Sequence, residues 1–223
     1  MNQRLDSFTL RDLFKRRWIP SLVSAAVLLF LAYVLEHAAN AYVFSYSLRP
    51  TSLPVGDILL DNIPVVDLNF IIIEVALIAV VVGALFILSR PRYVLFTLKT
   101  FAIFVVARAV AISLTHVGIH PDHVVIPGLG LFDSVYLYLN LQTGLFFSGH
   151  TGLPILMACI FWRERPARAI FLSLAAVFAV AVLLAHVHYS IDVFAAPFMA
   201  YGVYKFSEFL FPHDYALIEE ASA

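Results

Sequence analysis

Residues 169–192 read AIFLSLAAVFAVAVLLAHVHYSID, an apolar run that ends in two histidines and an aspartate. A helix needs about 20 such residues to cross the hydrocarbon core of a bilayer, so this run predicts a membrane span. His188 and Asp192 are four residues apart, and on a helix they would share one face and touch. A carboxylate that orients a histidine ring is a common way to prepare a nucleophile or a base.

The whole chain has the composition of a membrane protein. Of its 223 residues, 62% are hydrophobic and 13% are charged, and the mean hydropathy is +0.91. Soluble domains have about 45–50% apolar and about 25% charged residues. Apolar runs that approach the length of a span lie at 18–35, 68–88, 94–117, 146–162, 169–188 and 191–211. The sequence therefore predicts an all-α fold, a polytopic membrane protein built as a bundle of six transmembrane helices.

The chain divides into three parts around this bundle. Residues 1–17 alternate basic and apolar side chains, which predicts a short amphipathic helix on the membrane surface. Residues 18–212 form the predicted six-span catalytic domain, and residues 213–223 form a cytoplasmic tail. The net charge of −1 and the lack of a basic patch give no sign of a nucleic-acid partner. The sequence carries no information on oligomeric state.

The basic residues predict how the bundle is oriented. Five lie in the N-terminal segment, two at 89–93 and three at 163–168, whereas the intervening loops have one, none and none. Because cytoplasmic loops carry an excess of Lys and Arg, the N terminus and both basic turns are expected in the cytoplasm. Because the number of predicted spans is even, the C terminus is expected in the cytoplasm as well. The short loops and the Ala- and Val-rich spans favour a bacterial inner membrane; in a eukaryote the outer side would be the lumen or the cell exterior.

A second polar segment, FSGHT at 147–151, stands just ahead of another apolar run. A helix that begins there would present free backbone N–H groups, which bind phosphate well. In the predicted orientation His150 and His188 lie at the outer ends of their spans, and Asp57 lies in the first outer loop. Arg108 falls about nine residues, or roughly 13 Å at 1.5 Å per residue, inside the outer end of its span. The candidate site is therefore expected on the non-cytoplasmic, periplasmic side.

The two histidine segments resemble the catalytic motifs of a known family. FSGHT (147–151) and AHVHYSIDV (185–193) are similar to the two motifs of the sphingomyelin synthase family, a branch of the type 2 phosphatidic acid phosphatase superfamily. LPVGD (53–57), followed by Asp61, resembles that family's Pro-Leu-Pro-Asp loop, with Gly56 in place of one proline. The six-span layout is similar as well.

Further matches and departures concern the spans. Glu74 falls where the family has a glutamate in its second span, and Arg108 and Thr115 match an Arg and a Thr seven residues apart in its third-span motif. The segment 116–120 reads HVGIH instead of a proline-rich continuation, and TGL (143–145) stands where the family has Gly-Asp before Ser-Gly-His. The Lys-x6-Arg-Pro motif of ordinary phosphatases is missing, which favours the synthase-like branch.

The resemblance implies a division of labour among three catalytic residues. His188 would attack phosphorus and form a phosphohistidine, and Asp192 would orient its ring. His150 would protonate the leaving lipid alkoxide and then deprotonate the acceptor hydroxyl, because histidine titrates near neutral pH. The donor would be a phospholipid with a phosphocholine or phosphoethanolamine head group. The acceptor would be a lipid alcohol such as ceramide, or water.

Six further residues are candidates for binding the substrate. Ser148, Gly149 and Thr151 would hold phosphate oxygens at the helix start. Arg108 either faces the phosphate or pairs with Glu74 in the neighbouring span, since a buried arginine in a membrane needs an anion. Asp57 and Glu74 complete the set. No cofactor is implied.

Three alternatives stay open at this stage. His116, His120, Asp122 and His123 have a spacing that loosely suits a metal ion, although the resembling families work without one. Intramembrane serine hydrolysis would use Ser148 as nucleophile and His188 as base, but no Gly-x-Ser-x-Gly elbow is present. A non-enzymatic transporter or scaffold is the third class, and the lack of internal repeats counts against a transporter.

Overall fold

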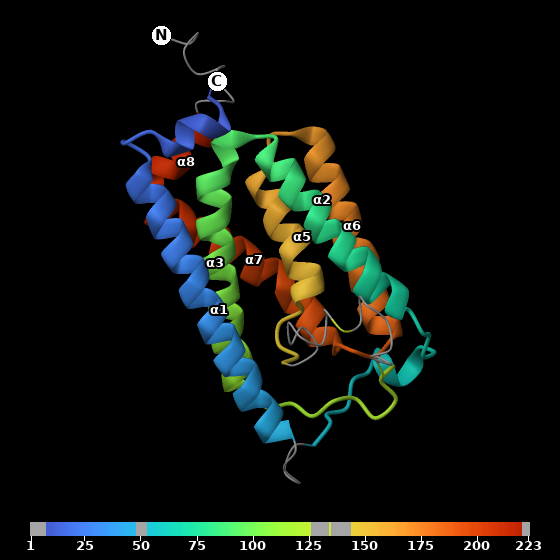
Figure 1. Cartoon of the computed structure of the whole chain (residues 1–223). Helices are drawn as coiled ribbons and strands as arrows, with labels where there is room; N and C mark the ends of the chain where they lie inside the picture. Colours follow the sequence, from blue (N-terminus) through green and yellow to red (C-terminus); the bar gives the residue numbers. More distant parts are fainter. Residues whose placement is uncertain (1–7, 48–52, 126–133, 135–143, 220–223) are drawn as a thin grey trace.

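A computed structural model describes residues 8–47, 53–125, 134 and 144–219 of the chain. Its elements are the 3-10 helix η2 (Leu10–Phe14), α1 (Ile19–Ser47), the 3-10 turn η3 (Leu60–Asn62), the π-helix η4 (Ile71–Val75), α2 (Ala76–Leu88), α3 (Pro91–Leu114), α5 (Gly149–Ile160), α6 (Arg165–Leu184), α7 (Ser190–Leu210) and α8 (Pro212–Glu219) (Figure 1). The described residues contain no strand, so the predicted all-α class is confirmed.

Four of these helical segments are long and apolar enough to cross a membrane, as a polytopic helical protein requires. They are Ile19–Tyr46, Ile71–Leu88, Pro91–Leu114 and Arg165–Leu184. Two further predicted spans fall short of this measure. The α5 helix is apolar but only 12 residues long, and α7 has 21 residues but carries Lys205 and Glu208 near its end. The count of six spans stays a prediction.

The first helix is much longer than predicted. The sequence predicts a first span over residues 18–35, with Glu36 just beyond its end, but α1 continues to Ser47. The helix does not end at Glu36 because the carboxylate of Glu36 pairs with Arg108 of α3. With its charge neutralised inside the bundle, Glu36 has no reason to end the helix.

The described parts of the two chain ends form the short helices η2 and α8. Residues 1–7 and 220–223 lie outside the described residues. The described part of the N-terminal segment has a five-residue 3-10 helix, η2, with Leu13 buried. Residues 212–219 form the helix α8, whose Leu217 and Ile218 are buried. The η2 and α8 helices lie at the same end of the bundle (Figure 1).

The helices pack so that α5 is enclosed. The α1 and α3 helices lie side by side along one flank, while α5 contacts both α6 and α7 (Figure 1). A large cluster of buried apolar side chains joins α3, α5 and α7 and includes Phe104, Leu156 and Ala200. This cluster holds the start of α5 at a set position relative to α3 and α7.

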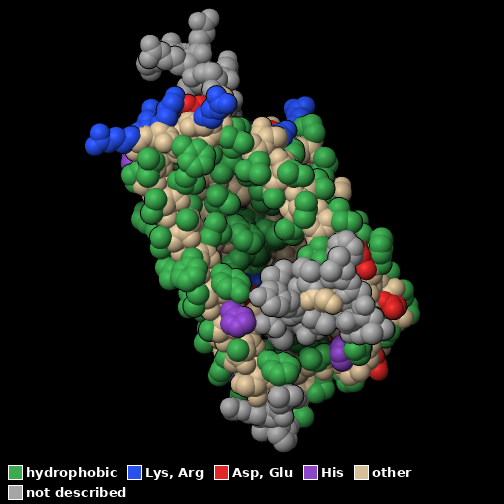
Figure 2. Space-filling view, viewed as in Figure 1, with side chains coloured by type: hydrophobic (Ala, Val, Ile, Leu, Met, Phe, Trp, Pro, Cys, Tyr) green, Lys and Arg blue, Asp and Glu red, His purple; other side chains and the backbone are tan. Residues whose placement is uncertain are grey.

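Side chains are distributed along the bundle as a membrane requires. Hydrophobic side chains cover the flanks of the face in Figure 2, whereas Lys and Arg gather at the end that carries η2 and α8. The same view shows a hollow with hydrophobic walls in the middle of the face, between α3 and α2. This charge distribution is the pattern on which the predicted orientation rests.

At the opposite end, the connecting segments are joined to one another by Tyr189. Its side chain is 2% exposed. The Tyr189 hydroxyl donates to the carbonyl of Gly118 at 2.9 Å and accepts from the backbone N–H of Val55 at 3.3 Å. The Gly118 N–H in turn donates to the carbonyl of Leu53 at 3.1 Å. The segments before α2 and after α3 are thereby held over the α6–α7 connection.

Gly118→Ala should destabilise the protein by about 1–3 kcal/mol, because the added methyl group overpacks a tight contact. A Cβ at this position would lie 2.7–2.8 Å from backbone atoms of Leu53 and Pro54, which cannot move aside as a flexible side chain does. Thermal unfolding of the detergent-solubilised protein measures the effect. Gly202→Ala in α7 is the control, since its Cβ would meet no atom within 4 Å. Equal melting temperatures for the two variants would contradict the prediction.

Candidate active site

The first part of the site is the N-terminus of α5. Ser148 is its N-cap, is fully buried, and its Oγ accepts from the N–H of Thr151 at 3.4 Å. The helix starts at Gly149, within the FSGHT segment in which the sequence predicts a helix start, because Ser148 caps it. The Thr151 Oγ1 is buried and has no hydrogen-bond partner in the part of the chain that the structure describes. A buried hydroxyl without a partner is costly, which points to a ligand at this helix start.

The second part is the N-terminus of α7. Here α6 ends at Leu184 and α7 begins at Ser190, so His188 lies in the connection and not on a helix. The sequence predicts that His188 and Asp192 touch because they share a helix face. They do lie close together, but His188 is not on a helix, so the predicted reason was wrong. Asp192 is the third residue of α7, and its Oδ2 accepts from the N–H of Tyr189 at 2.9 Å. The same oxygen lies 3.4 Å from Nδ1 of His188. The carboxylate thus caps its own helix and orients the histidine at once.

These contacts assign the proton on His188. An ionised carboxylate only accepts hydrogen bonds, so Nδ1 of His188 carries the hydrogen and Nε2 keeps the lone pair. His188 is 7% exposed and Asp192 is 3% exposed, so the pair is shielded from water. The arrangement prepares Nε2 as a nucleophile or a base.

The two helix starts meet through a backbone hydrogen bond. The N–H of Ser148 donates to the carbonyl of Asp192 at 3.1 Å. The rings of His150 and His188 have their centroids 6.2 Å apart and their planes at 69°. The structure therefore brings together the two polar segments that the sequence singles out.

His150 is oriented by the backbone of η4. Its Nε2 lies 3.1 Å from the carbonyl oxygen of Ile72. A carbonyl only accepts, so Nε2 carries a hydrogen. Ile72 lies in the single π-helical turn Ile71–Val75, and such turns are frequent at functional sites. No residue-type pattern marks a backbone carbonyl, so sequence reasoning missed this partner.

Arg108 of α3 lies next to the start of α5. It pairs with Glu36 and not with Glu74, the acid that the sequence suggested. Its Nη1 is 2.5 Å from Oε1 of Glu36, and its Nη2 donates to the carbonyl of Gly144 at 2.9 Å. A Cβ on Gly149 would lie 3.3 Å from Nε of Arg108. The ion pair of Arg108 is therefore with Glu36 of α1, where the sequence suggested Glu74 as the partner. That acid was missed because the sequence places it at a span end.

Glu74 and Asp57 occupy different surroundings. Glu74 lies in η4, and its Oε2 is buried without a hydrogen-bond partner among the described residues. Oδ2 of Asp57 accepts from the N–H of Ser190 at 2.6 Å, so this carboxylate caps α7 from another loop. Its Oδ1 accepts from Leu59 and Leu60. Asp57 therefore supports the connection that carries His188.

The four residues of the possible metal site are not brought together. The ring of His116 stacks on Tyr46 with centroids 3.8 Å apart, and His123 donates through Nδ1 to the carbonyl of His120. Nδ1 of His120 lies 3.4 Å from Nδ1 of His186. Among residues 8–47, 53–125, 134 and 144–219, no group of three or more His, Cys, Asp or Glu side chains is placed to hold a metal ion.

Comparison with known families points to the same region of the chain. Residues 143–209 match a family model described as PAP2 superfamily C-terminal. This segment contains both histidine motifs and the helices that present them. The match supports the type 2 phosphatidic acid phosphatase superfamily, whose members are lipid phosphatases or phosphotransferases, but it does not distinguish the sphingomyelin synthase-like branch. Comparisons with curated proteins and with solved structures found no significant match.

Asp57→Ala should lower the free energy of unfolding by about 1–2 kcal/mol at pH 7, because α7 loses its charged cap. Burial alone would raise the pKa of Asp57, but hydrogen bonds from Ser190, Leu60 and Leu59 outweigh it and lower the pKa from 3.8. A carboxylate with a lowered folded pKa stabilises the fold above its unfolded pKa. The stabilisation is lost as the pH falls through the folded pKa.

Melting temperatures of wild type and variant between pH 7 and pH 3 test this prediction. The difference between them should shrink toward the acid end. Asp61→Ala is the control, because Asp61 is exposed in the same loop. A loss of stability as large in Asp61→Ala as in Asp57→Ala would contradict the assigned cap.

Proposed function

We propose that the protein is a membrane-embedded lipid phosphotransferase that moves a phospholipid head group to a lipid alcohol through a phosphohistidine on His188. The family match supports lipid phosphatase or phosphotransferase chemistry. The observation that carries the finer proposal is the geometry of two neighbouring histidines, each oriented through one ring nitrogen. Asp192 engages Nδ1 of His188, Ile72 engages Nε2 of His150, and the two ring centroids lie 6.2 Å apart.

In the first half-reaction Nε2 of His188 attacks phosphorus and the phosphorus–nitrogen bond forms. The ester bond to the lipid alcohol breaks, and the leaving alkoxide takes a proton from His150, which enters this step as the imidazolium with a hydrogen on each ring nitrogen. Asp192 stabilises the positive charge that develops on the His188 ring. The products are a diacylglycerol-type alcohol and a phosphohistidine.

In the second half-reaction His150, now neutral, acts as the base. Its Nδ1 takes the proton of an acceptor hydroxyl, whose oxygen attacks phosphorus while the bond to His188 breaks. With ceramide or a similar lipid alcohol the reaction is a transfer. With water it is a hydrolysis of the phospholipase C or phosphatase type, and the first half-reaction is unchanged.

The start of α5 is our proposed phosphate site. The N–H groups at Gly149 and His150, with the Thr151 hydroxyl, point to a ligand because that hydroxyl is buried without a partner among the described residues. Arg108 adds a cation next to Gly149, with its charge offset by Glu36. Glu74 is our candidate for contacting a cationic choline or ethanolamine group. Asp57 acts through the α7 cap and positions the site.

The orientation and the membrane belong to the same proposal. Lys and Arg gather at the end of the bundle with η2 and α8 (Figure 2), and by the positive-inside rule this supports a cytoplasmic location for that end. The site then faces the periplasm in a bacterial inner membrane. The hollow with hydrophobic walls on the membrane-facing flank offers a surface for acyl chains.

The function is tested with purified protein and head-group-labelled phosphatidylcholine or phosphatidylethanolamine, each with and without ceramide. We expect label on ceramide when it is present and an acid-labile phosphohistidine as the trapped intermediate. His188→Ala should abolish both, and Asp192→Asn should reduce turnover roughly 10²- to 10⁴-fold. His37→Ala is the matched control, since His37 is exposed on α1. Absence of both transfer and hydrolysis for every lipid would refute the proposal.

Ser148→Ala separates this mechanism from serine hydrolysis. The Ser148 hydroxyl is an N-cap, so its loss should cost about 1 kcal/mol of stability and leave most of the activity. Turnover and melting temperature are measured on the same preparation. An inactive but folded Ser148→Ala protein would instead favour Ser148 as the nucleophile.

A further inference from the structure

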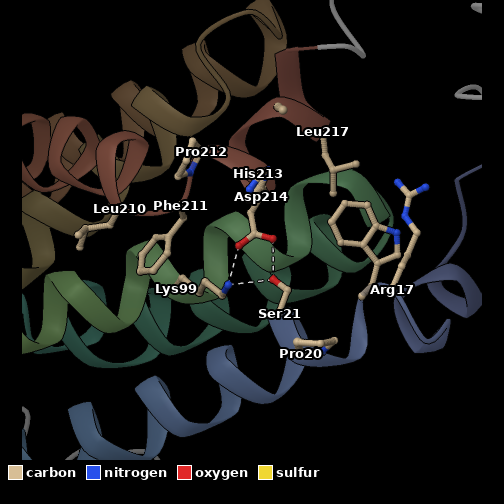
Figure 3. A pocket seen from close by; sticks show the side chains of 12 residues that line it. Arg17, Pro20, Ser21, Lys99, Leu210, Phe211, Pro212, His213, Asp214 and Leu217 are labelled. Atoms are coloured by element: carbon tan, nitrogen blue, oxygen red, sulfur yellow. Dashed lines mark hydrogen bonds and ion pairs between the residues drawn. The ribbon is translucent and has the colours of Figure 1, made fainter.

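A pocket lies at the end of the bundle opposite the candidate active site, between the start of α1, α3 and α8 (Figures 1 and 3). Its volume is about 500 Å³, which is within the range of about 300–1,000 Å³ for small-molecule sites. Basic side chains lie on its lining together with one carboxylate, and apolar side chains such as Phe211 form much of the rest. It shares no residue with the site at the starts of α5 and α7.

The polar centre of the pocket is a buried ion pair. Nζ of Lys99 donates to Oδ2 of Asp214 at 2.6 Å and to Oγ of Ser21 at 2.8 Å. The Ser21 hydroxyl donates in turn to Oδ1 of Asp214 at 2.6 Å, and Figure 3 shows the three side chains converging. The side chains of Lys99 and Asp214 are 6% and 4% exposed, so the pair is shielded from water.

Lys99 retains capacity for a ligand. An ammonium group has three N–H donors, and the described contacts use two. Lys99 itself lines the pocket, and the centroid of the Phe211 ring lies 5.1 Å from its Nζ. An aromatic ring attracts the charge but does not accept a hydrogen bond as an oxygen does. An anionic oxygen in the pocket would therefore satisfy the third donor.

The pocket also carries an excess of positive charge. Asp214 balances Lys99, whereas Arg17 has no carboxylate within ion-pair distance in the described part of the chain. Its guanidinium lies 4.5 Å from the centroid of Trp18, which holds it beside the pocket. His213 lines the same space. The charge favours an anion, and the apolar lining favours one that carries a hydrocarbon part.

We propose that this pocket binds the phosphate of an anionic phospholipid from the leaflet at the basic end of the bundle. Arg17 and the third N–H of Lys99 contact phosphate oxygens, and the acyl chains run along the apolar lining. Basic pockets between membrane helices commonly bind anionic head groups in this way. The bound lipid joins α1, α3 and α8 and stabilises the fold. The inference does not depend on the chemistry proposed for the other end.

The test measures melting temperature and lipid retention of the purified full chain in detergent. Phosphatidylglycerol and phosphatidylcholine with identical acyl chains are titrated separately. We expect phosphatidylglycerol to raise the melting temperature in a saturable way and phosphatidylcholine to have little effect. Arg17→Gln should weaken the apparent affinity about tenfold, as expected for loss of one charged hydrogen bond.

Arg16→Gln is the matched control, since Arg16 is the neighbouring exposed cation and does not line the pocket. Lys99→Met would leave Asp214 buried without its cation and unfold the protein, so the test rests on the exposed Arg17. Equal losses for Arg16→Gln and Arg17→Gln would show only diffuse surface attraction and overturn the proposal. So would a lack of preference for phosphatidylglycerol. Full stabilisation by inorganic phosphate alone would overturn the assignment to a lipid.

Discussion

The backbone hydrogen bond from the N–H of Ser148 to the carbonyl of Asp192 is the link on which the candidate site depends. It joins the cap of α5 to the first turn of α7, and so it places two helix N-termini side by side. Ser148 is fully buried, and an unpaired N–H there would cost about 1–3 kcal/mol. The apolar packing of α5 against α7 then holds His150 and His188 at their separation.

Helix capping explains how the bundle keeps polar groups inside an apolar protein. Asp192 and Asp57 both satisfy N–H groups at the start of α7, one from within the helix and one from a distant loop. The same contacts fix the position and tautomer of His188. Stability and preparation for chemistry therefore come from one set of hydrogen bonds, as expected where catalytic groups are held by supporting partners.

The α3 helix carries the buried cations of both ends. Arg108 pairs with Glu36 beside the candidate active site, and Lys99 pairs with Asp214 at the basic end. Charged groups within membrane helices are stable only when an anion offsets them. Each pair also joins α3 to another helix, α1 in one case and α8 in the other. The two ion pairs thus connect the helices that border the candidate active site and the pocket at the basic end.

The sequence by itself determined the helical membrane class, the two histidine segments and their shared end of the bundle, because apolar length, charge asymmetry and motif spacing are local properties. It also indicated the His188–Asp192 contact, though through a helix face where the structure has a capped connection. Only the tertiary structure decided that Arg108 pairs with Glu36, that Ile72 orients His150, and that Asp57 caps α7. These partners lie 72, 78 and 133 residues apart. Contacts between distant segments, and those made by backbone carbonyls, depend on packing and leave no periodic trace in the chain.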